Sequence, residues 1–285
     1  MKKLLYAFTI LGIINLSFGQ VQTPQPSPST EIKQVVGLTD VTIEYARPAT
    51  RGRVIFGDLV PYDQIWRTGA NANTKITFSD DVKIGDDLLQ SGSYAIYTRP
   101  SKDTWQVYFY TKTDNWGLPN EWDENLVAAT FITQVKHSDI KVENFTIEIR
   151  NLHNDGADLA LAWDDVYVKI PFEVPTKQKA LTSIENTLSA NPSGNDYYAA
   201  ASYYQQEGKD LEKALGWINK AIEENSERYW YHRPRALVLA DLGRYDEAIE
   251  AAQASLKLAE TAGNTDYVRL NEKSIVKWTK KLENQ

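Results

Sequence analysis

Hydrophobic and polar positions follow two different rhythms along this chain, and the rhythm changes near Pro175. Before that point, short runs alternate apolar and polar residues, as in Val41–Tyr45 (VTIEY) and Thr74–Phe78 (TKITF). After it, apolar residues recur at a helical spacing. Strict alternation predicts half-buried strands, whereas the longer spacing predicts amphipathic helices. The pattern therefore predicts a β domain over residues 31–174 and a helical domain over residues 175–285.

The β domain shows further runs rich in β-branched and aromatic residues. They are 93–97, 105–109, 145–149, 158–163 and 166–170. Gly, Asp and Asn clusters separate the runs, and Asp80-Asp81 and Asp164-Asp165 are expected in turns. Seven or more short strands at this spacing predict an antiparallel sandwich or barrel.

Apolar positions repeat every 34 residues in the last third of the chain. Four apolar columns keep this step: Ala180, Ala214 and Ala248; Leu181, Leu215 and Ile249; Ile184, Ile218 and Ala252; and Leu188, Ile222 and Leu256. Such a period is typical of stacked helix–turn–helix repeats of the tetratricopeptide kind. The alternative is a plain helical bundle with accidental spacing. We expect an α+β, multi-domain protein: an all-β antiparallel sandwich or barrel followed by an all-α, tetratricopeptide-like domain.

The helical pattern also gives the bounds of the expected helices. Six segments are predicted, over 176–190, 196–207, 211–224, a stretch ending near Leu242, 245–260 and 266–282. Gly208 and Gly243 follow two of them directly, where a left-handed residue commonly ends a helix.

The first residues are typical of an export signal. Lys2 and Lys3 precede a short apolar run, and Ser17 and Gly19 supply the small residues of a cleavage site. This predicts a signal peptide over 1–19, with an uncleaved anchor helix as the alternative. Residues 20–30 are rich in Pro and Ser, which predicts an extended, poorly ordered linker. We expect an exported protein, periplasmic or extracellular.

Composition narrows the chemistry. The chain has no cysteine, which excludes disulfides, thiolate metal sites and cysteine nucleophiles. A net charge of −7 argues against non-specific nucleic-acid binding. No segment after the signal reaches the ~20 apolar residues that a membrane-spanning helix needs. The three histidines stand far apart in no ligand spacing, so we expect no metal and no cofactor.

The densest stretch of unusual residues is 45–74. Its candidate ligand-binding side chains are Arg47, Arg53, Tyr62, Trp66, Arg67 and Asn71. An arginine presents a planar set of donors suited to anionic groups, and Trp66 could offer a stacking face to a sugar ring. A small anionic or sugar-like ligand is the functional interpretation. The alternative is that the arginines tie loops together while Trp66 fills the core.

Several motifs in and after this stretch resemble one family. They include GRVIFG over 52–57, LVPY over 59–62, WRTGAN over 66–71 and LALAW over 159–163. Together they resemble the domain of unknown function 2911, over about residues 30–172. The resemblance implies an exported protein of Bacteroidetes or related bacteria, in which appended helical repeats are common. It implies no catalytic residue.

A second candidate site is the acidic loop over 114–125. Trp116 and Trp122 with Glu121 and Asp123 have the ingredients of a carbohydrate cleft, which are stacking faces and carboxylates. The alternative is a solvated loop anchored by two tryptophans. A secreted glycan-acting hydrolase using Asp58, Glu121 or Asp123 is the rival function.

The leading hypothesis is a non-enzymatic binding or scaffolding protein of the cell envelope. Its helical domain is expected to contact a protein partner through the first helices of the pairs, which line the concave face of such arrays. The candidate contact residues there are Tyr198, Tyr204, His232 and Arg235.

Overall fold

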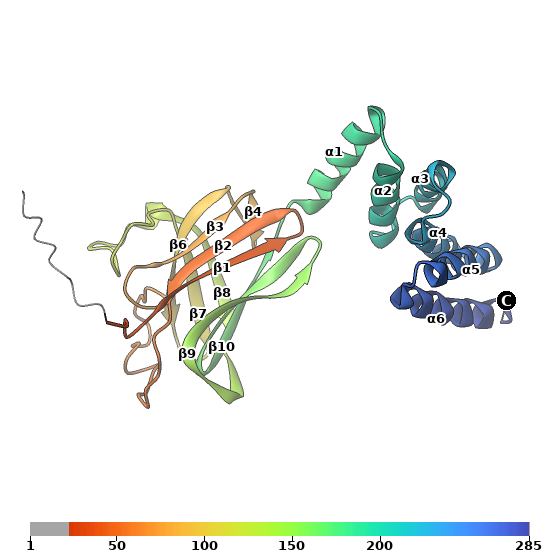
Figure 1. Cartoon of the computed structure of the whole chain (residues 1–285). Helices are drawn as coiled ribbons and strands as arrows, with labels where there is room; N and C mark the ends of the chain where they lie inside the picture. The colour runs from red at the N-terminus through yellow and green to blue at the C-terminus, as the bar shows by residue number, and fades with distance from the viewer. Residues whose placement is uncertain (1–22, 285) are drawn as a thin grey trace, which may run out of the picture. The chain divides into compact units, whose positions relative to one another are not determined.

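The computed structural model describes residues 23–284, and its chain divides into two compact units between Val174 and Pro175. The expected signal peptide lies outside the described residues. Figure 1 shows both units.

The first unit is built from two antiparallel sheets (Figure 1). The larger sheet has six strands in the order β1 (Ser29–Val36), β2 (Thr39–Ala46), β3 (Thr74–Phe78), β6 (Gly92–Pro100), β7 (Thr104–Tyr110) and β8 (Val127–Gln134). The smaller sheet has four strands in the order β5 (Asp87–Leu89), β4 (Val82–Ile84), β10 (Gly156–Glu173) and β9 (Lys136–His153). Two such faces bury one shared core, as expected for a β-sandwich.

Alternation along the strands explains which side chains form that core. In β2, Val41, Ile43 and Tyr45 are buried, while the residues between them are exposed or half-buried. The same core takes Trp105 from β7 and Trp163 from β10. The predicted antiparallel β domain is therefore confirmed.

One local prediction in this unit is wrong. Asp164-Asp165 forms no turn, because both residues lie inside the single 18-residue strand β10. Asp164 instead has φ of 52°, and the register with β9 shifts on both sides of it, so the polar pair marks a bulge. The described part of the Pro- and Ser-rich segment contacts the β unit, and its disorder stays a prediction. The backbone oxygens of Pro26, Ser27 and Pro28 accept hydrogen bonds from residues of the folded domain.

The second unit contains six helices. They are α1 (Thr176–Ser189), α2 (Gly194–Gln206), α3 (Leu211–Glu224), α4 (Tyr229–Asp241), α5 (Tyr245–Thr261) and α6 (Thr265–Leu282). Gly208 and Gly243 have positive φ just after α2 and α4, as expected for helix ends. A helical domain after the β domain is confirmed.

The packing of these helices follows the order of the chain. Helix α2 packs on α3, α4 on α5 and α5 on α6, while α2 also touches α4, and α4 touches α6. This succession is the one expected of stacked helix pairs. Their assignment to the tetratricopeptide class stays a prediction. Among residues 23–284, no helix combines the length and hydrophobicity needed to cross a membrane.

Candidate functional site

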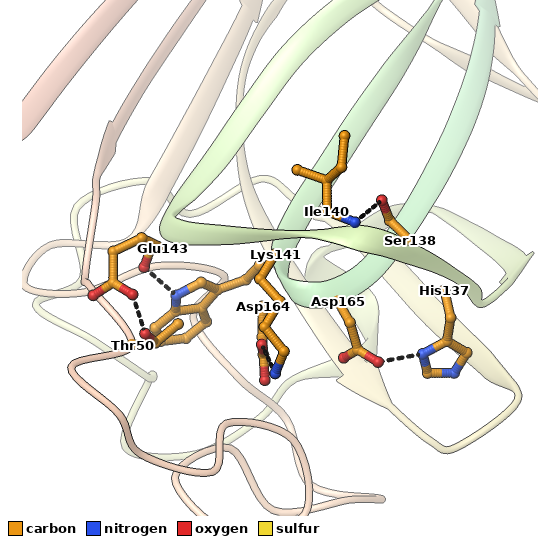
Figure 2. A network of polar contacts seen from close by, with 9 residues as sticks. Thr50, His137, Ser138, Ile140, Lys141, Glu143, Asp164 and Asp165 are labelled. Atoms are coloured by element: carbon orange, nitrogen blue, oxygen red, sulfur yellow. Dashed lines mark hydrogen bonds and ion pairs between the residues drawn. The ribbon is translucent and has the colours of Figure 1, made fainter.

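The arginine-rich loop after β2 is bound to strand β9. The Thr50 amide donates to the Glu143 carbonyl at 2.8 Å, and the Thr50 hydroxyl donates to the Glu143 carboxylate (Figure 2). That hydroxyl and the Arg51 amide lower the pKa of Glu143. The loop therefore lies along β9 as a fixed segment of the sandwich wall.

Two candidate arginines stabilise this arrangement. Arg47 donates from Nε to the Phe145 carbonyl at 3.1 Å and from Nη2 to the Thr146 hydroxyl at 2.7 Å. Arg53 donates to the carbonyls of Thr50 and Ala49 at 3.0 and 2.6 Å. Because both guanidinium groups bind neighbouring protein atoms, the structure supports the loop-tying interpretation for Arg47 and Arg53.

Trp66 belongs to the core of the sandwich. Its ring stacks on Trp163 with centroids 5.8 Å apart and planes 17° apart, and it meets Phe145 edge-on at 5.1 Å. Its Nε1 donates to the Gly69 carbonyl at 3.2 Å. The indole face that the sequence offers to a sugar is thus occupied by another tryptophan.

The remaining candidates of the first stretch divide into two groups. Tyr62 packs on Gly57, where an added Cβ would lie 2.7 Å from the Tyr62 ring. Arg67 lies against Gly117 of the second candidate loop, and Asn71 donates to the Ser27 carbonyl and lines a cavity together with Trp116. Arg67 Nη1 donates to the Asn71 carbonyl at 2.9 Å and would lie 2.9 Å from a Cβ on Gly117.

The two candidate sites predicted from the sequence are neighbours in the fold. The Asn73 backbone amide donates to the Asn115 backbone carbonyl at 3.2 Å, which joins the loop after Trp66 to the loop around Trp116. Asn115 Nδ2 donates to the Tyr97 hydroxyl, and that hydroxyl donates to the Gly117 carbonyl at 3.3 Å. Burial raises the pKa of Tyr97, so this hydroxyl stays protonated as a donor.

Trp116 lines two adjacent cavities. The first, of about 490 Å³, is also lined by Asn71, Asn73, Tyr45, Glu44 and Lys75. The second, of about 550 Å³, is also lined by Lys112, Asp114, Asn115, Asn120 and Glu121. The Trp116 side chain is 77% exposed, whereas Trp66 packs against the core. We call Trp116 and these two cavities the Trp116 site.

Asn73 was not singled out from the sequence, although it follows the WRTGAN motif by two positions. It is 6% exposed and lines the first cavity. Its Oδ1 has no hydrogen-bond partner within the part of the chain that the structure describes. A buried amide oxygen normally has a hydrogen-bond donor, so Asn73 Oδ1 leaves an unmet acceptor in the wall of the first cavity.

Two further residues of the acidic loop, Trp122 and Asp123, have contacts that stabilise the fold. Trp122 stacks on Tyr110 at 4.8 Å and meets Tyr97 edge-on, on the outer face of the large sheet. Asp123 Oδ1 accepts from the Asn125 amide at 2.9 Å and caps a short 3₁₀ turn. Asp58 is exposed and lines neither cavity of the Trp116 site.

A further hollow, which the sequence did not suggest, lies over the bulged part of β9 and β10. It has a volume of about 650 Å³, and its walls combine apolar side chains such as Ile140 and Val142 with charged ones. His137 Nδ1 lies 2.9 Å from Asp165, and Lys141 pairs with Asp164 at 2.8 Å (Figure 2). The Ser138 hydroxyl accepts a hydrogen bond from the Ile140 backbone amide at 3.1 Å. Within residues 23–284, no group of three or more His, Asp or Glu residues could hold a metal ion.

The four candidates on the helical unit all have intramolecular partners. Tyr198 stacks on Tyr231 at 5.4 Å, and Tyr204 is 7% exposed against Trp217. His232 bonds to the Ser226 carbonyl at 2.8 Å, and Arg235 donates to Asn219 at 3.0 Å. Their role in binding a partner stays a prediction.

Comparison with known proteins agrees with the motifs in the β unit. Residues 27–172 match the family described as Protein of unknown function (DUF2911), and the chain belongs to that family. The searches of curated proteins and of solved structures gave no match.

Proposed function

We propose that this is an exported, non-enzymatic binding protein whose β domain holds a neutral saccharide at the Trp116 site. The observation that carries the proposal is the exposed Trp116 indole, which borders two cavities rich in amides and carboxylates. An indole offers an apolar face to the C–H side of a sugar, while amide and carboxylate groups accept and donate hydrogen bonds to its hydroxyls. Export rests on the predicted signal peptide.

The charges at the site favour a neutral ligand over an anionic one. The first cavity is lined by Glu31, Glu44 and one lysine, Lys75, which is already paired with Glu44 at 2.5 Å. The second is lined by Lys112 and three acids, Asp114, Glu121 and Asp123. An anionic group would meet an excess of negative charge, whereas a hydroxyl-rich ligand can use the same carboxylates as acceptors.

The hydrolase alternative has less support. Glycoside hydrolysis needs two carboxyls that face each other across the scissile bond. Of the three carboxylates considered from the sequence, Asp58 lines neither cavity and Asp123 caps a turn. Glu121 shares the second cavity with Asp114 and with Asp123, which caps a turn, and the exposed Trp116 ring beside them favours binding over hydrolysis.

The test is a glycan array followed by calorimetry on the full chain and on Trp116→Ala. We expect neutral glycans to bind the wild type and to lose at least about tenfold in affinity, or about 1.4 kcal/mol, in the variant. Ile140→Ala is the matched control, because Ile140 is 78% exposed but lies on β9 away from the Trp116 site. It should bind like the wild type.

Two results would contradict the proposal. One is selective binding of anionic glycans that persists in Trp116→Ala. The other is the release of a shortened glycan, which would support the alternative function, a glycan-acting hydrolase. Asn71→Gly provides a second arm, since φ of 61° at Asn71 suits glycine, and it should also weaken binding. It removes the side-chain amide together with its hydrogen bond to the Ser27 carbonyl, so thermal melting must accompany the binding measurement.

A further inference from the structure

Helix α1 has an apolar stripe that the rest of its unit covers only in part. Leu181, Ile184 and Leu188 are half-buried, and Thr176 is the buried residue of this helix. Residues at the same step in α3 are covered much better. Leu215 and Ile218, 34 positions after Leu181 and Ile184, are 7% and 0% exposed.

The uncovered stripe borders a cavity between α1 and α3. Its volume is about 520 Å³, and its apolar lining comes from α1, from Tyr204 at the end of α2 and from Trp217 on α3. The residues 34 positions after Tyr204 and Trp217 are Val238 and Ala251, which are 0% and 1% exposed. We call the cavity the α1–α3 groove. The two large aromatic rings stand where the next repeat has small or aliphatic side chains.

The charged residues of the groove are mainly basic. The Lys213 ammonium lies 5.0 Å from the Trp217 ring centroid, and the Lys209 ammonium lies 5.5 Å from that of Tyr204. Neither lysine forms a salt bridge with any carboxylate in the described part of the chain. Glu185 is the acidic residue of the lining. The groove therefore combines an apolar floor with two cations that are available to a carboxylate.

We infer that the α1–α3 groove binds an acidic peptide segment that carries apolar side chains. Apolar side chains of the partner fill the space between Ile184 and Trp217, and its carboxylates pair with Lys209 and Lys213. Burial of the half-covered stripe supplies the driving force, and the two cations select the sign of the partner's charge. The inference is independent of saccharide binding, and it places the partner on a surface other than the one expected from Tyr198, His232 and Arg235.

The test selects binders for the full-length protein from a displayed library of random peptides. We expect the enriched peptides to combine Asp or Glu with Leu, Ile, Phe or Trp, and to bind at least about tenfold more weakly to Lys209→Glu/Lys213→Glu. The matched control is Lys273→Glu/Lys277→Glu, which changes the net charge equally at two exposed positions of α6. Circular dichroism and thermal melting establish that both double variants fold.

An apolar arm of the same test uses Ile184→Ala, with Val276→Ala on α6 as its control because Val276 is 57% exposed. Only the first should weaken the selected peptides. The inference is overturned if no peptide is enriched, if basic peptides are enriched, or if the Lys209/Lys213 variant binds like its control. It is also overturned if sedimentation shows a dimer that this variant alone dissociates, because the occupant is then a second copy of the chain.

Discussion

Trp66 and Trp163 lie face to face in the sandwich core, with ring centroids 5.8 Å apart and planes 17° apart. One ring comes from the WRTGAN motif in a long loop, and the other from strand β10 of the smaller sheet. The contact therefore ties the loop to the sheet, and the Trp163 indole also donates to the Glu143 carbonyl at 3.2 Å. Stacking of this kind gives the motif a structural role on the core side, while its last residues reach the Trp116 site.

The first prediction separates a structural tryptophan from a binding one. Trp66→Ala should lower the free energy of unfolding by about 3 kcal/mol, because it leaves a cavity among Trp163, Phe145 and Trp105. Trp116→Ala should change it by no more than about 0.5 kcal/mol, because that ring is 77% exposed. Urea denaturation of both variants measures the difference. Equal losses would place Trp116 in the fold rather than in a site.

How far the sequence predicts this fold depends on whether burial follows a simple period. The strand over Thr74–Phe78 was predicted with the bounds that the structure gives, because its side chains alternate cleanly. The edge strand Ser29–Val36 was missed, since it begins in the Pro- and Ser-rich segment and only its last residue is buried. Asp164-Asp165 was read as a turn because a bulge and a turn favour the same residue types.

The candidate site was predictable in its parts but not in its assembly. Trp116 and Asn71 were both singled out, yet nothing in their spacing of 45 positions shows that they line one cavity. Trp66 and Trp116 are the same residue type, and each lies in a loop between strands. Trp66 packs against Trp163, Phe145 and Trp105, whereas Trp116 is 77% exposed, and these contacts are a property of the tertiary fold.

The second prediction concerns Gly117, which has φ of +93° and a Cβ position 2.9 Å from Arg67 Nη1. Gly117→Ala should destabilise the protein by more than about 1 kcal/mol, because backbone strain is added to a clash with Arg67. It should also weaken saccharide binding by displacing the loop around Trp116. Thermal melting and calorimetry are the measurements.

Gly52→Ala is the control for that substitution. Gly52 also has positive φ, at +71°, but an added Cβ meets nothing within 4 Å. It should therefore show the strain alone and keep full binding. If both alanine variants behave alike, the packing of Arg67 beneath Gly117 has no part in shaping the Trp116 site.

The third prediction is a pH dependence centred on Asp158, a 7% exposed residue of β10. Burial alone would raise the pKa of this carboxyl, but hydrogen bonds from Asn151 at 2.6 Å and Lys169 at 3.0 Å lower it below its ordinary value. Because the folded-state pKa is the lower one, the stabilisation is fully present above the unfolded pKa of about 3.9. It is lost as pH falls through the folded-state pKa.

Asp158→Asn provides the comparison. At pH 7 the variant should be less stable than the wild type by about 1–2 kcal/mol, since the charge-assisted bond to Lys169 is removed. Below about pH 4 the two melting temperatures should converge. Melting curves between pH 7 and pH 2 test this, and a gap that widens on acidification would show that the sign of the effect is wrong.

The last prediction concerns a buried hydrogen-bond network in the helical unit. Asn271 on α6 is fully buried, donates to the Ser255 hydroxyl at 2.9 Å and accepts from Arg233 at 3.2 Å. Ser255 in turn donates to the Tyr229 carbonyl at 2.8 Å, so these hydrogen bonds join α4, α5 and α6. Asn271→Ala leaves Arg233 and Ser255 without one hydrogen-bond partner each in the buried interior, and should lower the free energy of unfolding by about 1–3 kcal/mol.

Ser274→Ala is the comparison. It removes a half-buried hydroxyl that also accepts from Arg233, at 2.9 Å, and should cost less because Asn271 still binds the guanidinium. Urea unfolding followed by circular dichroism at helical wavelengths ranks the two variants. If Ser274→Ala lowered the free energy of unfolding more than Asn271→Ala, the packing of α4, α5 and α6 would depend on the half-buried edge of the interface rather than on the buried hydrogen bonds of Asn271.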